Sequence, residues 1–354
     1  MNKHKLSAKY IIVGAGLSGL TTANSLLETG EDDFIILEGR NHIGGRINTH
    51  KGIDMGATWF QDHHLNLNKL LDRFNINIFE QYGKGQSVLV YNTMAPAHFF
   101  ENSQEAPSAS RVVNGTTAIV EKLAMPLKDK IIRNTKIIEV TEVQHTLHLK
   151  TENDIIFSAE KVVVTVPPKL ASTLKYSPGL PTEFSTTMKH THTWMSNAIK
   201  VGLLFEKAFW REKNFSGTVI GQVGPIIELY DHCNYENSIF GLMGFANEGL
   251  RDFPKQERKK KILDYLEKYL GKEIKKYTLY LEKDWSKDRF TSCENLKSVY
   301  MSPQYGNPLF NDFYMDGKLF FSGTETSPVY GGYLDGAVYS GIRAAEKLTN
   351  KVLT

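Results

Sequence analysis

The sequence is poor in cysteine, in charge of one sign and in long apolar runs. Two cysteines, Cys233 and Cys293, occur in 354 residues, so the fold does not rest on disulfides and a reducing compartment suits the chain. The 42 basic and 39 acidic residues leave a net charge of +3, which gives no reason to expect a nucleic-acid partner. No apolar window approaches the roughly eighteen residues that a transmembrane helix needs. We therefore expect a cytoplasmic protein without a membrane segment.

Metal-ligating patterns are also lacking. His63 and His64 are adjacent, so their side chains point in different directions, and no carboxylate or cysteine stands at a ligand spacing from them. We predict that both are surface or helix-cap histidines and that the chain has no metal site.

What the sequence does contain is a glycine-rich turn directly after a short apolar run at residues 10–13. Gly14, Gly16 and Gly19 have the spacing G-x-G-x-x-G, and apolar residues at helical spacing follow as far as Gly30. The first glycine allows a tight turn, the second lets a pyrophosphate approach the backbone, and the third lets the helix pack closely on the strand. The free N–H groups at the start of that helix would face the phosphate.

A second apolar strand, residues 34–37, ends on Glu38, which is placed to accept hydrogen bonds from a ribose. Strand, helix, strand and acid in this order predict a bound dinucleotide, but they do not choose between NAD and FAD. Soon afterwards, Gly44, Gly45 and Arg46 suggest a second loop across the cofactor. Arginine in that loop can pair with phosphate oxygens through two hydrogen bonds.

Three later segments extend this pattern: residues 54–59 (DMGATW), 319–326 (LFFSGTET) and 331–337 (GGYLDGA). Together with the fingerprint and the G-G-R loop, they resemble the flavin-dependent amine oxidase family, which includes monoamine, polyamine and L-amino-acid oxidases. The resemblance spans nearly the whole chain and favours FAD over NAD. The cofactor-binding residues that it implies are Gly14, Gly16, Gly19, Glu38, Gly39, Arg40, Gly44, Gly45, Arg46, Gly56, Ala57, Thr58, Ile137, Gly323, Thr324, Glu325, Gly332, Tyr333 and Ala337.

The resemblance also implies the residues at the reacting centre. Lys200 lies in a β-rich segment, residues 197–205, where a lysine is by itself typical of a sheet edge or a solvent-facing position. In the family, the matching lysine holds a water against flavin N5, where a fixed cation would stabilise developing charge. Tyr333 matches one wall of the family's aromatic cage, and Tyr330 stands where some members have tryptophan.

Three departures from the family pattern carry predictions. The polar stretch 101–110 is too short for the helical insertion that covers the substrate cavity in longer members. Some members attach FAD through a cysteine, but Cys293 falls one residue before that position and Glu294 occupies it, so we predict non-covalent FAD. Asn295 falls at the other cage position, which leaves the cage incomplete.

The predicted fold class is α/β, with a discontinuous Rossmann-type FAD-binding domain and a second, sheet-based substrate domain. The first would comprise residues 1–78, 111–187 and 288–354, and the second residues 79–110 and 188–287.

The predicted function is an FAD-dependent amine oxidase, acting as a monomer or homodimer on a small primary or secondary amine or an amino acid. It would pass hydride from the amine to flavin N5 and reduce O2 to H2O2. Two alternatives stay open at this point: an FAD-dependent desaturase or dehydrogenase with another electron acceptor, and a low-turnover FAD-binding partner protein.

Overall fold

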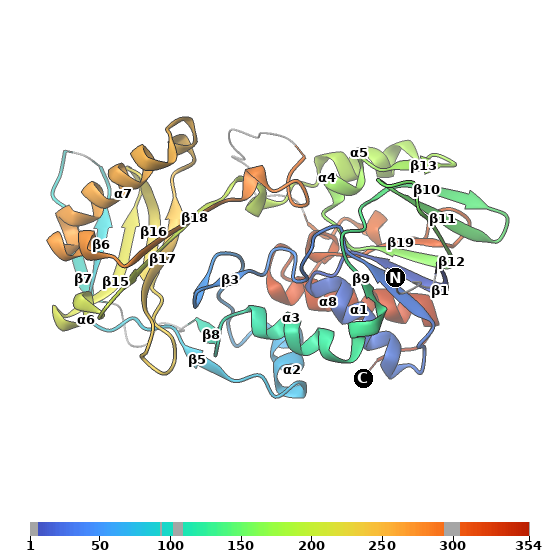
Figure 1. Ribbon diagram of the computed structural model, residues 1–354, viewed down its shortest axis with the longest axis horizontal. Coiled ribbons are helices and arrows are strands. Elements are labelled where there is room, and N and C mark those ends of the chain that lie inside the picture. Colours follow the sequence, from blue (N-terminus) through green and yellow to red (C-terminus); the bar gives the residue numbers. More distant parts are fainter. Residues whose placement is uncertain (1–5, 93, 102–108, 294–304, 354) are drawn as a thin grey trace.

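The computed structural model describes residues 6–92, 94–101, 109–293 and 305–353. Figure 1 shows two lobes side by side, each built around one large β-sheet, with the chain crossing between them several times. We call the sheet that contains β1 the first sheet and the sheet that contains β14 the second sheet. The described part of the chain has no helix long and apolar enough to cross a membrane.

The first sheet is parallel at its centre. In spatial order its strands are β13 (Lys175–Ser177), β10 (Ile137–Val143), β11 (Thr146–Thr151), β12 (Ile156–Val164), β1 (Ser7–Val13), β2 (Phe34–Leu37) and β9 (Ile131–Ile132), with β19 (Leu319–Phe321) also paired to β12. The central strands are apolar on both faces, as expected of a parallel sheet that is covered on both sides.

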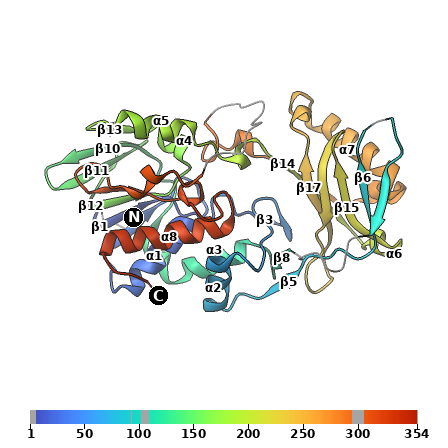
Figure 2. The same ribbon diagram turned by 180° about the vertical axis from the view of Figure 1, so that it is seen from behind.

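Helices cover the two faces of the first sheet. On one face lie α1 (Leu17–Glu28), α8 (Leu334–Thr349), α3 (Thr117–Ala124) and α2 (Leu65–Arg73), and on the other lies α5 (Thr182–His190) with the short α4 (Pro168–Ala171). The helices α1 and α8 come from opposite ends of the sequence and lie side by side (Figures 1 and 2). Their approach is close, because a Cβ built at Gly341 would stand 2.6 Å from the carbonyl oxygen of Ser18.

The second sheet is largely antiparallel. Its strands are, in order, β18 (Leu279–Asp284), β14 (Ile199–Phe205), β17 (Phe240–Ala246), β16 (Ile226–Asp231), β15 (Phe215–Gly221), β6 (Gln86–Val90) and β7 (His98–Glu101). The helix α7 (Lys255–Leu270) packs on one face, and the segment from Ile53 to Trp59 packs on the opposite face. The remaining short elements are β3 (Thr49–His50), β4 (Ile53–Asp54), β5 (Ile78–Glu80), β8 (Ser110–Val112) and α6 (Phe209–Glu212).

The α/β fold class is confirmed. Residues 131–143 form two strands, β9 and β10, which lie in different parts of the first sheet. The interpretation of Lys200 as an edge or solvent-facing residue is wrong, because β14 lies between β17 and β18 and Lys200 is only 1% exposed. Most of the expected polar loop, residues 102–108, lies outside the described residues.

Candidate functional site

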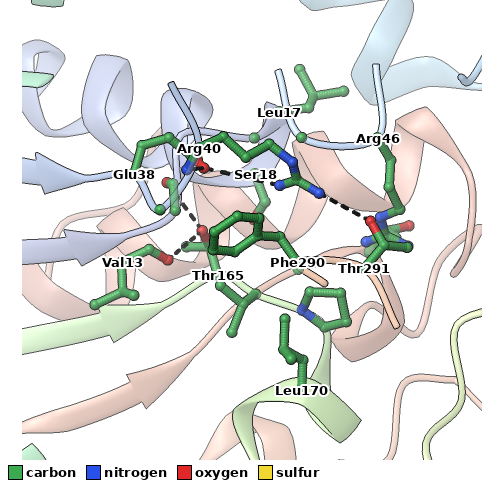
Figure 3. Close-up of a pocket in the computed structure, with 18 of the residues that line it drawn as sticks. Val13, Leu17, Ser18, Glu38, Arg40, Arg46, Thr165, Leu170, Phe290 and Thr291 are labelled. Atoms are coloured by element: carbon green, nitrogen blue, oxygen red, sulfur yellow. Dashed lines mark hydrogen bonds and ion pairs between the residues drawn. The ribbon is translucent and has the colours of Figure 1, made fainter. Parts of the chain in front are cut away.

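A cavity of about 260 Å³ lies at the carboxyl ends of the parallel strands of the first sheet. Its lining includes the residues that follow four of these strands: Gly14 after β1, Glu38 after β2, Thr165 after β12 and Gly323 after β19. In open α/β sheets, ligands bind at this edge. Figure 3 shows the lining side chains gathered from distant parts of the sequence around this space.

The glycine turn shapes one wall of the cavity. Gly14 has φ of +110°, a conformation that favours glycine, and a Cβ at Gly19 would stand 2.0 Å from the Gly14 carbonyl oxygen. Gly16 differs, because a Cβ there would meet no atom within 4 Å and would point into open space. Gly16 also begins α1 without any side-chain cap, so the helix N-terminus is available to an anion. This wall therefore fits a pyrophosphate.

Glu38 lines the cavity directly after β2. Its carboxylate is buried and accepts hydrogen bonds from the backbone N–H of Ala15 (2.7 Å) and of Arg40 (2.8 Å). Each bond uses one oxygen, so both oxygens keep acceptor capacity for ribose hydroxyls. The Arg40 guanidinium donates hydrogen bonds to Asp288 (2.7 Å) and to Thr291 (3.1 Å). Figure 3 shows the bond to Thr291.

Arg46 and Glu325 form a buried ion pair across 279 residues of sequence. Both guanidinium NH2 groups bond the carboxylate, one of them at 3.0 Å, and Thr193 donates a further bond of 2.7 Å. Burial alone would raise the pKa of Glu325, but the charge and hydrogen bonds of Arg46 outweigh it and lower that pKa. Arg46 lines the cavity and keeps other N–H donors for a ligand.

Lys200 packs behind residues 53–58, the segment that begins with β4. Its Nζ donates to the carbonyl oxygens of Asp54 (3.0 Å) and Gly56 (2.6 Å) and to Oγ1 of Thr58 (2.8 Å). These three bonds use all three hydrogens of an ammonium group. Burial lowers the pKa of Lys200 to about 7, although the Asp54 charge opposes the shift. Lys200 is therefore a cation that can lose its proton near neutral pH.

A buried polar cluster lies next to Lys200. Asp54 accepts bonds from Thr49 (2.6 Å) and Thr116, and its backbone N–H donates to Nε2 of His232 at 3.0 Å. Burial raises the pKa of Asp54, while burial and the positive charge of Arg111 hold the pKa of His232 well below its usual range. His232 is therefore neutral.

At the opposite end of the cavity, α8 begins at Tyr333 without a side-chain cap, so a second helix N-terminus faces this space. Tyr333 lines the cavity and is 56% exposed, which places it where the cavity meets solvent. Trp194 lines the same end, and its indole N–H donates to the Gly332 carbonyl oxygen (3.1 Å).

The structure brings most of the predicted cofactor residues to this cavity. Those that line it are Gly14, Gly16, Glu38, Gly39, Arg40, Gly44, Gly45, Arg46, Ala57, Ile137, Gly323, Thr324, Gly332, Tyr333 and Ala337. Gly19, Gly56, Thr58, Glu325 and Lys200 lie behind this lining, whereas Tyr330 is 38% exposed and lies beside His64. Glu294 and Asn295 lie outside the described residues.

Several residues that line the cavity were not predicted from the sequence, notably Thr165, Trp194 and Phe290. Thr165 was open to prediction, since it follows a strand that ends at the same edge as β1. Trp194 and Phe290 lie in segments without a matching motif, and their positions depend on tertiary packing. Phe290 covers Gly39 so closely that a Cβ there would stand 2.4 Å from its ring.

The fold and the cavity together fit a two-lobed nucleotide-binding protein, with its ligand at the carboxyl edge of the first sheet. The chain belongs to the flavin containing amine oxidoreductase family, whose sequence model matches residues 17–93 and 83–349. Membership establishes a flavin-dependent oxidoreductase.

Known proteins with related sequences are flavin-containing amine oxidases. The probable flavin-containing monoamine oxidase A of Dictyostelium discoideum is 22% identical, over 97% of this chain and 98% of that protein. Amine oxidase B of Cavia porcellus is 28% identical, over 68% of this chain but only 47% of its own length. The alignment with the Dictyostelium protein extends over 453 residues, more than the 354 of this chain, so it contains stretches that this chain lacks.

Solved structures show the same fold. A putrescine oxidase bound to putrescine superimposes with a TM-score of 0.86 at 22% identity, over 98% of this chain and all of that one. Cyclohexylamine oxidase from Brevibacterium oxydans gives a TM-score of 0.84 at 17% identity, over 97% and 99% of the two chains.

Proposed function

We propose that this chain is an FAD-dependent oxidase of small primary or secondary amines. The observation that carries the proposal is one row of side chains across the second sheet, on the face that packs against residues 53–59. Glu228, Phe245 and Lys200 stand opposite one another on β16, β17 and β14, so their side chains share that face. The row combines a carboxylate, an aromatic ring and a buried cation beside a flavin site.

FAD suits the cavity because each part of the lining matches one part of that cofactor. Glu38 would bind the ribose, the uncapped start of α1 and Arg46 would bind the pyrophosphate, and the start of α8 would lie near the flavin ring. When bound, FAD would accept a hydride from the amine at N5 and pass the electrons to O2, which forms H2O2. Cys293 lies beside Lys169 and not among the cavity-lining residues, which supports non-covalent binding.

The protein residues have separate tasks in this proposal. Tyr333 forms one wall against the substrate, Tyr330 supports that wall, and Lys200 places a positive charge behind residues 54–58. A fixed cation there would stabilise negative charge that develops as O2 is reduced. Holding a water at flavin N5, the role that the family resemblance implies, would require Lys200 to exchange one of its three bonds to residues 54–58.

We further propose that the first-sheet lobe is the FAD-binding domain and the second-sheet lobe the substrate domain, with the limits predicted from the sequence. The strand order of the sheets supports this division. Strands β6 and β7 belong to the second sheet with β14 to β18, although most strands of the first sheet come after β7 in the sequence.

Glu228 favours amines over amino acids. It is half-buried and accepts a hydrogen bond from the Tyr230 hydroxyl at 2.9 Å. Tyr230 packs edge-on against Trp59, whose ring centroid is 4.9 Å away, on the side of the sheet that carries Lys200. A carboxylate in this position attracts a second cationic group and repels a substrate carboxylate. Monoamines and short diamines such as putrescine are therefore the first compounds to test.

The glycine turn gives a sharp test of the cofactor site. Gly19→Ala should lower stability by about 1–3 kcal/mol, because the new Cβ would overlap the Gly14 carbonyl oxygen. Gly16→Ala should cost less, about 1 kcal/mol, because alanine is a poorer N-cap residue than glycine, and it should weaken FAD binding, because its Cβ enters the space for the pyrophosphate. Thermal unfolding of the apoprotein and FAD titration measure the two effects. Unchanged FAD affinity in Gly16→Ala would place the pyrophosphate elsewhere.

An amine panel tests the proposed activity. Purified protein loaded with FAD should produce H2O2 with at least one monoamine or diamine, and amino acids should be poorer substrates. Acid precipitation should release the flavin into solution as FAD. Flavin bleaching without peroxide would instead indicate a dehydrogenase with another acceptor. If no amine bleaches the flavin under anaerobic conditions while dithionite does, the amine oxidase proposal is wrong.

A further inference from the structure

Four rings form a contact cluster beside the outer end of the cavity. The rings of His63 and His64 meet edge to face, with centroids 4.7 Å apart and an interplanar angle of 80°. Tyr330 contacts both of them, at 5.2 Å from His63 and 4.7 Å from His64. His64 also contacts Tyr333 at 5.5 Å. We call these four residues the ring cluster.

The surrounding structure holds the backbone of Tyr330 and Tyr333, the two tyrosines of the ring cluster, in a defined conformation. Tyr330 has φ of +44°, the left-handed conformation that a tyrosine rarely adopts. Its carbonyl oxygen lies so near α8 that a Cβ at Gly336 would stand 2.4 Å from it. Thr324 donates to the carbonyl oxygen of Tyr333 at 2.7 Å. Such strain persists where the surrounding structure holds it, and it often marks a functional position.

His64 is held as a neutral ring. It is 5% exposed, and its Nδ1 accepts a hydrogen bond from the backbone N–H of Gln61 at 3.3 Å, which puts the proton on Nε2. Protonation at Nδ1 would remove that bond. Besides the tyrosines of the ring cluster, two titratable groups face His64. Asp335 on α8 already accepts hydrogen bonds from the Leu67 N–H (2.8 Å) and from Asn66 (2.9 Å). The neighbouring His63 disfavours a positive charge on His64.

We propose that His64 is a positioning residue for the amine substrate: its ring holds Tyr330 and Tyr333 as a wall where the cavity opens, and His63 extends that wall outward. The inference rests on the proposed amine oxidation and adds a specificity element to it. An amine approaching flavin passes Tyr333, so the orientation of that ring determines which substrates enter. A wall of neutral rings binds the apolar part of an amine and also attracts its cationic head.

This arrangement has a pH consequence with a defined sign. Burial lowers the pKa of His64 below its usual 6.5, and the Asp335 charge only partly opposes this. The native state therefore binds the His64 proton less readily than the unfolded state, so the contribution of neutral His64 is complete above pH 6.5 and is lost as the pH falls. Acid should loosen the wall and place a positive charge beside the entering amine.

Two substitutions at position 64 separate ring packing from titration. His64→Ala removes the ring contacts, and the KM for the best amine should rise about 5- to 10-fold with a smaller change in kcat. His64→Phe keeps a ring that cannot be protonated, so it should restore the wild-type KM near neutral pH and abolish the acid-side rise in KM. His98→Ala is the matched control, since His98 is an exposed histidine stacked on Phe100 in β7.

A second readout does not depend on turnover. In protein with ¹³C-labelled histidine, the His64 ring proton resonances should show ring-current shifts that Tyr330→Leu reduces and that His98→Ala leaves in place. The inference is overturned if His64→Ala has the kinetics of the control, or if His64→Phe is as impaired as His64→Ala. It is also overturned if Tyr330→Leu leaves the His64 resonances unmoved. If the wild-type protein oxidises no amine, the proposed function is wrong, and so is the role of His64 in positioning the amine. The His64 resonances would still show whether the ring cluster forms.

Discussion

Replacing Lys200 with methionine should slow the reaction of the reduced flavin with O2 by about 10²–10³-fold, the effect of removing one preorganised charge-stabilising donor. Lys200 is buried, and its Nζ lies behind the backbone of residues 54–58, part of which lines the cavity. The measurement is stopped-flow mixing of photoreduced enzyme with oxygenated buffer. Anaerobic reduction by the amine should change less, because it does not require the charge on Lys200.

The pH dependence of the same step should follow Lys200. Burial lowers its pKa to about 7, so it is cationic below that pH and neutral above it. The rate of reaction with O2 should therefore fall as pH rises through about 7. Because the unfolded chain keeps this proton up to about 10.5, the stability of wild type relative to Lys200→Met should rise between those two pH values.

Controls separate charge from packing. Lys200→Arg retains a charge that does not titrate in this range, so any remaining oxygen reactivity should lose its dependence on pH. Lys207→Met removes a lysine that is 65% exposed and should behave like wild type. If Lys200→Met reacts with O2 at the wild-type rate and with the wild-type pH profile, the proposed role of Lys200 is wrong.

The second large effect is expected on stability, when the ion pair between Arg46 and Glu325 is broken. Glu325→Gln should destabilise the protein by about 3 kcal/mol, because it leaves the guanidinium partly buried without its counter-charge. Chemical denaturation measures this loss. Glu273→Gln breaks the pair with Lys213, in which the two side chains are 38% and 40% exposed, and should cost less than about 1 kcal/mol.

A double variant distinguishes stability from cofactor binding. Arg46→Met combined with Glu325→Leu removes both charges, which typically restores much of the stability lost when one partner is removed. It should still bind FAD weakly, since the N–H donors of Arg46 that line the cavity are gone. Wild-type FAD affinity in the double variant would contradict a contact between Arg46 and the cofactor.

The extent to which the sequence predicts this site depends on how local each feature is. The turn from Gly14 to Gly19 was predictable, because strand, turn and helix follow one another within a few residues. Arg46 and Glu325 were each placed at the cofactor, but their pairing was not predicted, since it joins segments 279 residues apart. The burial of Lys200 depends on the strand order of the second sheet, which no local pattern encodes.

The histidine pair shows the same limit. Adjacent histidines without ligand spacing predict no metal site, and this stays a prediction; the described residues include no group of three or more candidate ligands. His64 does begin α2, as a cap histidine would, but it is buried. Its contact with Tyr330 arises only after α8 has packed beside α2, which brings together residues more than 260 positions apart in the chain.

The pairing of α1 with α8 has a consequence for how the protein is made. The glycine turn leaves the ribosome well before α8, and the Ser18 hydroxyl can bond Ser322 (2.7 Å) and Ser340 (3.1 Å) only after those residues, more than 300 positions later, have emerged. Until then, the face of the first sheet that α8 covers is shielded only by α1, α2 and α3. The nascent chain is therefore expected to acquire its cofactor only after residues 322–340 have emerged, and chaperones that shield apolar surface would act on it during that interval.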